Sequence, residues 1–430
     1  MRFLFVNQYY APDFAATAQQ MSDLCEKLAA EGHEVHVLSG RALYDGRDID
    51  LPAYETINGV HVHRVKICNQ SRARFRDRFL GYICFSFLAF FKATFLPRFD
   101  VVVTLTTPPM IALLGTWLRL VRKSRFVYWV MDIYPDIALE AGVLKKFGPI
   151  TGIWNILGRI SYLTANRVVV LGEDMKKVMR RKGIPERKLQ VIQSWACGEE
   201  IRPIPSNDNR FRRESLRPHK FTLMYSGNMG TCHAFESVIE GIKVLEDDPR
   251  FDFVFIGAGK KLEELQHRLS GMDGRVRFMP YQERSLLAET LSAPDAHLAT
   301  LDPRYDGLLV PSKLYGIMAA GKPVVFVGSP ENEIARIIAE SRCGLRVDPE
   351  NPQSFADALR RLADSPDEAR EFGGNGRRAF DERYERDSLC AKFMTLLEDE
   401  AHRPGVRGER TLAHPVVTSR PARQGEQVLE

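Results

Sequence analysis

The chain lacks any hydrophobic run long enough to cross a membrane. The charge-free apolar run beside its most basic region covers thirteen residues, 79–91, and is closed by a basic residue on each side. A membrane-spanning helix needs roughly 18 or more. Only four apolar residues separate Arg2 from Asn7, which is too few for the core of a signal peptide. We therefore expect neither a transmembrane helix nor a secretion signal.

Closely spaced cysteine pairs are also absent. The seven cysteines lie far apart in the sequence, and no C-x-x-C pair occurs. A scattered, odd-numbered set of this kind does not indicate a disulfide framework and is typical of free thiols in a reducing compartment. The cysteine pattern therefore predicts a cytoplasmic protein with free thiols.

Strong net charge and a dinucleotide-binding fingerprint are missing as well. The formal net charge of +5, from 60 basic and 55 acidic residues, is too small to predict nucleic-acid binding by itself. The loop after the first apolar run reads NQYYAPDFA from Asn7 and contains no G-x-G-x-x-G. Because that glycine pattern brings the backbone against a pyrophosphate, its absence argues against a dinucleotide oxidoreductase.

The chain does have length and a regular alternation of strands and helices. Its 430 residues exceed the roughly 250–300 that one hydrophobic core usually supports, so two domains are expected. Short apolar runs alternate with amphipathic segments, which is typical of right-handed βαβ units and of a parallel sheet covered on both faces. The expected strands are residues 2–6, 35–38, 60–65, 101–105, 125–131, 167–171 and 189–194 in one half, and 221–225, 251–256, 276–279, 296–300, 324–327 and 344–347 in the other.

A polar, proline-bearing segment at residues 203–209 separates the two halves. We therefore predict an α/β protein with one Rossmann-like domain at 1–202 and a second at 203–401, which includes a terminal helix from about residue 387 to residue 400. Because such sheets bind ligands at the carboxyl ends of their strands, the expected site is a cleft between the domains. Residues 402–430 are rich in Arg, Pro and Gly, which indicates a disordered tail.

One segment of the second half, residues 302–327, predicts binding of a phosphate-bearing ligand. It reads as a loop, a short helix opened by Pro311, Ser312 and Lys313, a stop at Gly321, and a buried strand. Ser312 is suited to cap this helix, whose free N–H groups and dipole attract anions. Lys313 adds a positive charge at the same place. A helix joined to a strand, with no ligand, is the alternative.

Five motifs resemble those of family 4 glycosyltransferases of the GT-B fold, which build bacterial capsule, exopolysaccharide or O-antigen chains. They are NQYYAPDFAATAQQMSDLCEKLAAEGHEVHVLSG from Asn7, YWVMDIYPDIALEAG from Tyr128, YSGNMGTCHAFESVIEG from Tyr225, FVFIGAGK from Phe253 and VPSKLYGIMAAGKPVV from Val310. The resemblance implies two Rossmann-like domains facing across a cleft. It also implies a metal-independent hexosyltransferase without a cofactor, which moves a sugar from a nucleoside diphosphate donor to an acceptor and retains the configuration of the sugar.

The resemblance also implies where the site residues lie. Lys313, at the helix start, would hold the diphosphate, and Asp132, at the end of a strand in the first domain, would act beside the reacting sugar. The other donor-site candidates are Asn228, Gly230, His233, Gly257, Gly259, Tyr281, Ser312 and Glu333. The candidates for a loop that contacts the acceptor or the phosphates are Phe14, Thr17 and Asp136. The alternative for each of these residues is a structural role, as a turn residue, a helix cap or a solvated side chain.

Departures from the family pattern keep other functions open. Many members carry two glutamates, at positions where this chain has Leu308 and, eight residues later, Gly316. Asn228 stands where many members have an arginine, and His233 lies close to a lysine position. The alternatives are therefore a non-catalytic sugar-nucleotide-binding partner of a glycan-assembly complex and a GT-B sugar-nucleotide epimerase. The donor base stays open between UDP and GDP.

The segment from Arg72 to Lys92 combines basic and aromatic residues. Between Arg64 and Arg98 eight residues are basic and one, Asp77, is acidic. A helix of this type can lie on an anionic bilayer, with its cations at the headgroups and its rings below them. We therefore expect peripheral contact with the inner leaflet of the cytoplasmic membrane, which suits a glycan acceptor carried on polyprenyl diphosphate. A core helix with a solvated basic end is the alternative.

Overall fold

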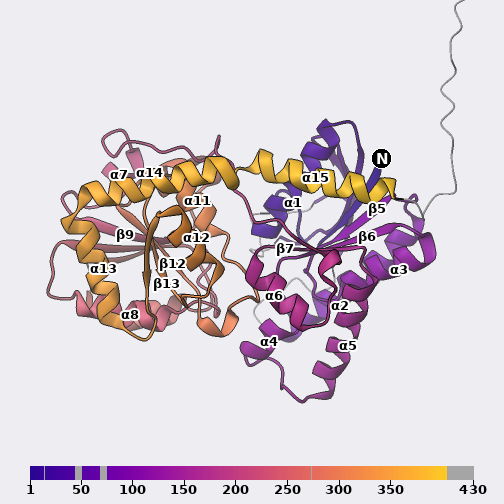
Figure 1. The fold of residues 1–430 in the computed structure, drawn as a ribbon, viewed down its shortest axis with the longest axis horizontal. Helices are drawn as coiled ribbons and strands as arrows, with labels where there is room; N and C mark the ends of the chain where they lie inside the picture. Colours follow the sequence, from indigo (N-terminus) through magenta and orange to yellow (C-terminus); the bar gives the residue numbers. More distant parts are fainter. Residues whose placement is uncertain (14, 44–50, 68–74, 273, 404–430) are drawn as a thin grey trace, which may run out of the picture.

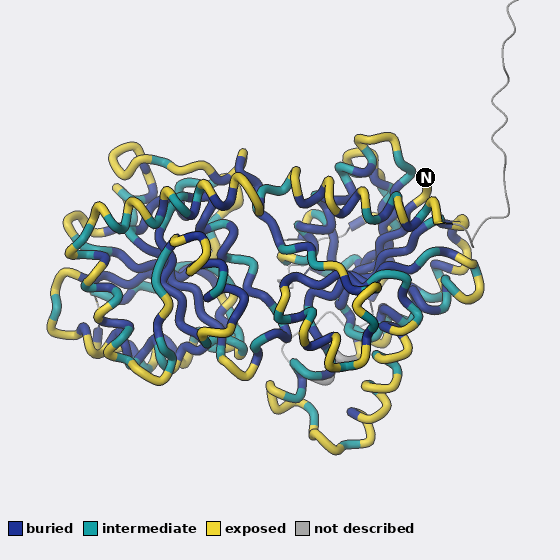
Figure 2. The backbone as a smooth tube through the Cα atoms, in the orientation of Figure 1, coloured by how far each residue is buried: buried dark blue, intermediate teal, exposed yellow. Residues whose placement is uncertain are grey.

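The protein contains two separate β-sheets, each covered by helices (Figure 1). Its computed structural model describes residues 1–13, 15–43, 51–67, 75–272 and 274–403. Figure 2 shows that the strands of both sheets are buried, while exposed residues concentrate on the outer helices and loops. The two-domain α/β architecture predicted from the alternation of strands and helices is therefore confirmed.

The first sheet has eight strands within the described chain, in the order β3-β4-β2-β1-β5-β6-β7-β8. All neighbours pair in parallel except β3, which runs antiparallel to β4. The strands are β1 (Arg2–Val6), β2 (Glu34–Gly40), β3 (Tyr54–Ile57), β4 (Val60–Val65), β5 (Val101–Thr104), β6 (Arg125–Val130), β7 (Arg167–Val170) and β8 (Leu189–Val191).

Strand β3 was not predicted from the sequence. It pairs with β4 through a tight turn at Asn58-Gly59, and both turn residues have positive φ angles. Asn-Gly is favoured in two-residue hairpin turns because both positions need a left-handed backbone. Since β3 is short and half exposed, this dipeptide was a clearer sequence signal than the strand itself.

Helices cover both faces of the first sheet. On one face, Leu4 and Val102 of the sheet pack with Phe85 of α2 and Leu114 of α3, and α5 lies beside α3. The opposite face is covered by α1 and α15. The helices of this domain are α1 (Ala16–Ala30), α2 (Phe75–Phe95), α3 (Ala112–Arg122), α4 (Asp136–Glu140), α5 (Pro149–Thr164), α6 (Glu173–Arg181), the 3-10 helix η1 (Glu186–Lys188) and α15 (Arg386–His402).

The dipeptide Pro108-Pro109 predicts a helix that starts at the prolines and reaches Lys123, but the helix begins later, at Ala112. Residues 108–111 form turns instead, and the Ile111 N–H donates to the Pro108 carbonyl at 3.0 Å. Proline is suited to the start of a helix because it lacks an N–H, but here it begins the preceding turn. The helix itself was predicted correctly.

Among the described residues the second sheet has six strands, all parallel, in the order β11-β10-β9-β12-β13-β14. The strands are β9 (Phe221–Ser226), β10 (Phe251–Ile256), β11 (Val276–Met279), β12 (Ala296–Thr300), β13 (Val324–Val327) and β14 (Gly344–Val347). The helices are α7 (Arg210–Ser215), α8 (Phe235–Val244), α9 (Leu262–Arg268), η2 (Ser270–Met272), η3 (Arg284–Leu286), α10 (Leu287–Ser292), η4 (Pro303–Tyr305), α11 (Lys313–Ala319), α12 (Glu333–Ser341), α13 (Pro352–Asp364) and α14 (Pro366–Arg383).

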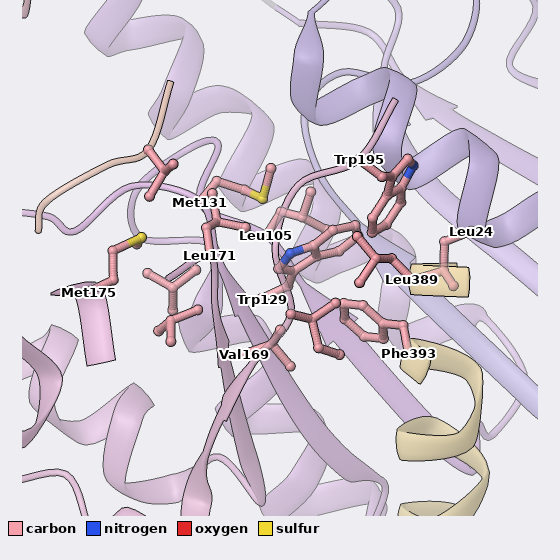
Figure 3. Packing of buried hydrophobic residues seen from close by; sticks show 14 of the residues in the cluster. Leu24, Leu105, Trp129, Met131, Val169, Leu171, Met175, Trp195, Leu389 and Phe393 are labelled. Atoms are coloured by element: carbon pink, nitrogen blue, oxygen red, sulfur yellow. The ribbon is translucent and has the colours of Figure 1, made fainter. Parts of the chain in front are cut away.

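Helix α15 crosses from the second domain to the first (Figure 1). This helix was predicted to belong to the second domain, but it packs against α1, β5 and β6 of the first. Figure 3 shows Phe393 of α15 against Trp129 of β6, with ring centroids 4.7 Å apart. Because Trp129 is a large, almost fully buried side chain, α15 completes the core of the first domain.

Two expectations about the whole chain concern membranes and cysteines. Within the described ranges, no helix is both long and apolar enough to span a bilayer. Six of the seven cysteines lie in those ranges, and all six are free thiols, as expected.

Candidate functional site

The carboxyl ends of the two sheets meet through backbone contacts. Asp132 follows β6 and forms an antiparallel bridge with Leu309, and the Ile133 N–H donates to the Leu308 carbonyl at 2.9 Å. Leu309 lies four residues before Lys313, the first residue of α11. The predicted catalytic loop of the first domain therefore lies next to the predicted diphosphate-binding helix of the second.

Lys313 carries a buried amine. Its Nζ is shielded from water, has no hydrogen-bond partner among the residues that the structure describes, and lies 3.6 Å from the centre of the Tyr225 ring. Burial lowers the pKa of Lys313 to about 7. An aromatic face attracts an ammonium group, but buried cations are normally paired with an anion. An anion bound beside Lys313 would stabilise its charged form.

Ser312 does not cap α11, contrary to the expectation. It has helical backbone angles, φ −67° and ψ −16°, and its side chain makes no capping hydrogen bond. A capping side chain normally needs an extended backbone at this position. Since α11 is also only seven residues long, the Lys313 amine supports anion binding better than the helix end does. The predicted left-handed stop at Gly321 is confirmed, with φ 65°.

Glycines bring two loops of the second domain into backbone contact. The Gly227 N–H donates to the Ile256 carbonyl at 2.9 Å, and the Met229 N–H donates to the Ala258 carbonyl at 2.8 Å. A Cβ at Gly257 would collide with the Gly227 carbonyl. Loop-to-loop packing thus gives these glycines a structural role, and their predicted approach to a nucleotide stays a prediction.

Gly259, two residues after Gly257, also lies where a side chain would collide with the facing loop. A Cβ there would collide with the Met229 backbone, and its φ of 150° suits glycine. The Tyr281 ring lies beside this loop, 3.3 Å from the Cβ position of Gly257, and the residue is half exposed. Asn228 is exposed, and its amide lies 3.1 Å from the Cβ position of Gly230. These predicted donor residues therefore border one surface near Lys313.

His233 is a half-buried neutral histidine beside Lys313. Its Nδ1 lies 2.6 Å from the Thr300 carbonyl, so Nδ1 must carry the proton of this hydrogen bond. Burial, followed by the nearby Lys313 charge, lowers the pKa of His233 to about 3. A neutral ring has one N–H, which is already used. Donation to a phosphate, as predicted, would therefore require an anion that raises this pKa.

Asp132 lies in a poorly solvated position at the end of β6. Burial raises the pKa of its carboxyl group to about 6. The thiol of Cys232 is within electrostatic range of both Asp132 and Lys313, and burial raises its pKa to about 11. Cys232 is thus near enough to both predicted catalytic residues for their charges to affect its pKa. A carboxylate that titrates near neutral pH can exchange a proton or accept a hydrogen bond during a reaction.

Glu333 connects the two domains. Its carboxylate accepts a hydrogen bond from the Glu173 N–H at 2.9 Å, at the start of α6, and pairs with Arg336 of its own helix. Burial raises the pKa of Glu333. Asn332, rather than Glu333, caps α12 through its side chain. The predicted contact between Glu333 and the donor stays a prediction. What the structure shows is that Glu333 links the two domains.

The predicted acceptor-loop residues have different surroundings. Asp136, the first residue of α4, forms an ion pair with Lys182 at 2.7 Å. Thr17 lies in the first turn of α1, after a turn in which the Asp13 side chain accepts from the Ala15 N–H. Phe14 lies outside the described residues. The predicted role of Asp136 and Thr17 near the acceptor stays a prediction.

Two residues of this site, Tyr225 and Cys232, were not predicted from the sequence. Tyr225 places its ring against the Lys313 amine and donates its hydroxyl hydrogen to the Asn228 carbonyl at 2.6 Å. Cys232 lies near both Asp132 and Lys313. The signal for Tyr225 was its position at the carboxyl end of β9, directly before the glycine loop. Cys232 gave no signal because an isolated cysteine is usually a small core residue.

Comparisons with known proteins agree with this arrangement. Two family models match: a glycosyl transferase 4-like domain over residues 16–195 and glycosyl transferases group 1 over residues 220–365. WbjE of Pseudomonas aeruginosa, named as a glycosyltransferase, is 30% identical over 337 residues, which cover 77% of this chain and 83% of WbjE. WcaI of Escherichia coli strain K12, named as a colanic acid biosynthesis glycosyl transferase, is 24% identical over 84% of this chain and 91% of WcaI.

The fold is also similar to that of solved structures. HepE of Anabaena, crystallised in complex with UDP-glucose, aligns with a TM-score of 0.69 over 93% of this chain and 100% of the HepE chain. The identity is 15%, so this similarity concerns the fold alone.

Proposed function

The chain belongs to the glycosyltransferase family that combines a glycosyl transferase 4-like domain with a group 1 domain, and we propose that it transfers a sugar from a nucleoside diphosphate sugar to a lipid-linked glycan in polysaccharide biosynthesis. The resemblance found in the five motifs, the GT-B fold and the transferase class are confirmed. Support for the donor class comes from HepE, solved with UDP-glucose, and support for polysaccharide biosynthesis from the name of WcaI.

The buried amine of Lys313 carries the proposal. Departure of the sugar leaves negative charge on the diphosphate, and a pre-positioned cation in a dry site stabilises that charge strongly. Lys313 has no carboxylate partner among the described residues, so its charge is available to a ligand. A diphosphate at this place would also raise the pKa of Lys313 and keep the amine protonated.

Asp132 is the proposed first-domain participant. It adjoins the residues leading to α11 and titrates near neutral pH. In the proposed reaction, the bond from the sugar C1 to the diphosphate oxygen breaks, and a bond from C1 to the acceptor oxygen forms. The proton of the acceptor hydroxyl passes to the departing diphosphate. Asp132 orients a hydroxyl group beside the reacting carbon, and the configuration is retained. NMR of the product would disprove retention if the new linkage were inverted.

The nucleotide site can be tested without knowing the sugar. Thermal unfolding would be measured with UDP, GDP, ADP and dTDP in turn, without added metal. A ligand at about 100 times its dissociation constant stabilises by roughly 2.7 kcal/mol. The Lys313→Gln variant should lose most of this shift, while Lys243→Gln on α8, which removes a solvent-exposed partner of Glu240, should keep it. Equal thermal shifts with nucleotide in both variants would show that Lys313 is not part of the nucleotide site.

A non-catalytic partner is the alternative that one observation favours. Leu308 is buried, and a Cβ at Gly316 would meet the side chains of Leu291 and Ile201. The two positions where many family members carry glutamates thus have apolar surroundings here. An enzyme should lose turnover in Lys313→Ala or Asp132→Ala while remaining folded. A protein that binds nucleotide but transfers no sugar would be such a partner, and one that converts the free sugar nucleotide would be an epimerase.

The lipid-linked acceptor is proposed together with a peripheral location at the inner face of the membrane. Support comes from α2, which exposes Leu80, Ile83, Phe87, Phe91 and Phe95. Lys92 lies in the last turn of that helix. Arg72 and Arg74, and the side chains of Arg76 and Arg78, lie outside what the structure describes, so the basic part of the expected patch stays a prediction. Flotation of the protein with anionic vesicles tests this location.

A further inference from the structure

Helix α5 and the turn before it carry a second apolar face, separate from that of α2. The exposed large apolar residues of this segment, here called the α5 face, are Val143, Phe147, Ile150, Ile153, Ile156, Ile160 and Leu163. Phe147 is 94% exposed, and Ile153 and Ile156 are 60% and 62% exposed. Scattered single apolar residues are normal on a protein surface, but a contiguous patch usually marks an interaction site.

The opposite side of α5 is firmly packed. Tyr162 is buried and lies against Tyr128 of β6, with ring centroids 5.1 Å apart. The isoleucines follow one another at steps of three or four residues, which places them on one side of the helix. Figure 1 shows α5 at the lower edge of the first domain, and Figure 2 shows the many exposed residues along it. The apolar side chains therefore point outward because the helix is anchored by its other side.

The charges on this segment have one sign. From residue 141 to residue 164 the chain has three basic residues, Lys145, Lys146 and Arg159, and no acidic residue. All three basic residues are exposed. The Lys146 amine lies 5.9 Å from the centre of the Phe147 ring, so cationic and apolar groups are adjacent. A surface that is apolar and cationic is complementary to anionic headgroups above hydrocarbon.

The α5 face continues toward α2 across α3. Helix α3 contacts both α2 and α5, and it exposes Leu120 and Val121. The three helices lie on one face of the first sheet. A broad, gently curved partner such as a bilayer can contact all three, whereas a single docked helix would cover only one.

Aromatic contacts connect α5 to the loop that bears Asp132. Trp154 of α5 stacks with Tyr134, at a centroid distance of 6.1 Å and an interplanar angle of 8°. Tyr134 lies two residues after Asp132. Any surface on which α5 rests therefore has a short structural connection to the candidate catalytic carboxylate.

We propose that the α5 face, with Lys145 and Lys146 beside Phe147, binds a lipid bilayer with anionic headgroups. The α5 face would lie in the interfacial layer, with the isoleucines and Phe147 below the headgroups and the lysines among them. The inference rests on the proposed function because a lipid-linked acceptor gives this contact its purpose. In that arrangement the MDIYPD loop, which begins at Met131, lies close to the bilayer from which the acceptor is presented.

The test uses the full chain and vesicles of phosphatidylcholine, with or without phosphatidylglycerol. The variant Ile153→Asp with Ile156→Asp should bind anionic vesicles about tenfold more weakly or worse, because two inserted apolar side chains become charged. Lys145→Gln with Lys146→Gln should weaken binding to anionic vesicles by about tenfold and reduce its dependence on salt. Val244→Asp on α8 is the control, since it places one aspartate at an exposed apolar position of the second domain.

Three results would overturn the proposal. The first is a wild-type chain that does not float with anionic vesicles, and the second is an isoleucine variant that binds within about twofold of wild type. In the third, ultracentrifugation shows a wild-type dimer and a monomeric isoleucine variant, and the wild type does not bind vesicles, so the α5 face is an interface between copies. Vesicle binding needs no turnover. If the protein binds vesicles but transfers no sugar, this inference therefore stands and the proposed function fails.

Discussion

Gly257 holds two loops of the candidate donor site in direct contact, and its substitution should be costly. A Cβ would collide with the Gly227 carbonyl, and the φ angle of 135° lies where side chains are rarely accommodated. We expect Gly257→Ala to destabilise the protein by about 3 kcal/mol, measured by urea unfolding. Gly374→Ala is the control. It lies in α14 with nothing within 4 Å of the Cβ position, and it should stabilise by about 0.5–1 kcal/mol. A similar loss in both variants would contradict this account.

A histidine cluster on β2 and β4 predicts sensitivity to acid. His36 Nδ1 lies 3.0 Å from His63 Nε2, and the His61 ring lies at a tilt of 35° to the His36 ring, with centroids 4.8 Å apart. Burial, followed by the charges of His36 and Lys92, lowers the pKa of His63 to about 4. The folded chain thus takes up fewer protons than the unfolded chain below about pH 6.5. Stability should be full above that pH and decrease as the pH falls toward 4.

The variant His63→Asn tests this assignment. It should show a smaller loss of stability between about pH 7.5 and pH 5, because one of the groups that must be protonated on unfolding is gone. Urea unfolding at the two pH values gives the comparison. His402→Asn, which removes a histidine outside the cluster, should keep the wild-type difference. An unchanged pH dependence in His63→Asn would show that other groups govern the acid response.

Single residues illustrate what sequence can and cannot predict. The position of Lys313 could be predicted because its motif follows a loop and precedes a glycine stop. Its burial against Tyr225 could not, because that contact joins segments far apart in the chain. Ser312 was assigned as a cap from its residue type, but capping depends on a backbone angle that residue type does not fix. Local chemistry was therefore predictable, and its tertiary surroundings were not.

Helix α15 is attached to the first domain by a buried ion-pair network. The Glu400 carboxylate is fully buried and pairs with Arg125 at 2.6 Å and with Arg167 at 2.9 Å. Glu400 also pairs with the more exposed Arg403 at 3.1 Å, so Glu400→Gln keeps the side-chain size but leaves three arginines without this anion. We expect a loss of about 3 kcal/mol in urea unfolding. The neighbouring exposed Asp399→Asn should change stability by less than about 0.5 kcal/mol. Equal effects in the two variants would refute the role of the network.

At the scale of elements, strands were easier to predict than the helices that cover them. The buried strands of both sheets are runs of Val, Ile and Phe, which local pattern identifies directly. Helix α5 was not predicted, since its isoleucines face outward and give no conventional core stripe. Helix α15 was predicted, but its domain was not. An amphipathic pattern shows that a helix buries one side, not which sheet it meets.

The two domains share one continuous apolar cluster. It includes Phe5 and Trp129 of the first domain, Tyr315 and Phe326 of the second, and Phe393 of α15. Two further contacts across the boundary, from Glu333 to the Glu173 N–H and from Arg336 to Asp174, add polar links. The molecule should therefore unfold with its two predicted domains coupled.

A fragment of residues 1–202 tests that coupling. It lacks α15, so Trp129 would lose the Phe393 ring that packs on it. We expect the fragment to lose the near-UV circular dichroism of its tryptophans and to be far less stable than the full chain. Addition of a peptide of residues 386–402 should restore part of the signal. A fragment that folds stably by itself would contradict the dependence on α15.

The position of α15 also has a consequence for synthesis. The sheet of the first domain emerges from the ribosome early, but the helix that covers Trp129 is translated about 200 residues later, at 386–402. At about 5–20 residues per second, this interval lasts roughly 10–40 s. During that time the nascent chain holds an unfinished apolar surface in the cell. A chaperone that binds nascent chains would therefore be expected to associate with this protein until translation is almost complete.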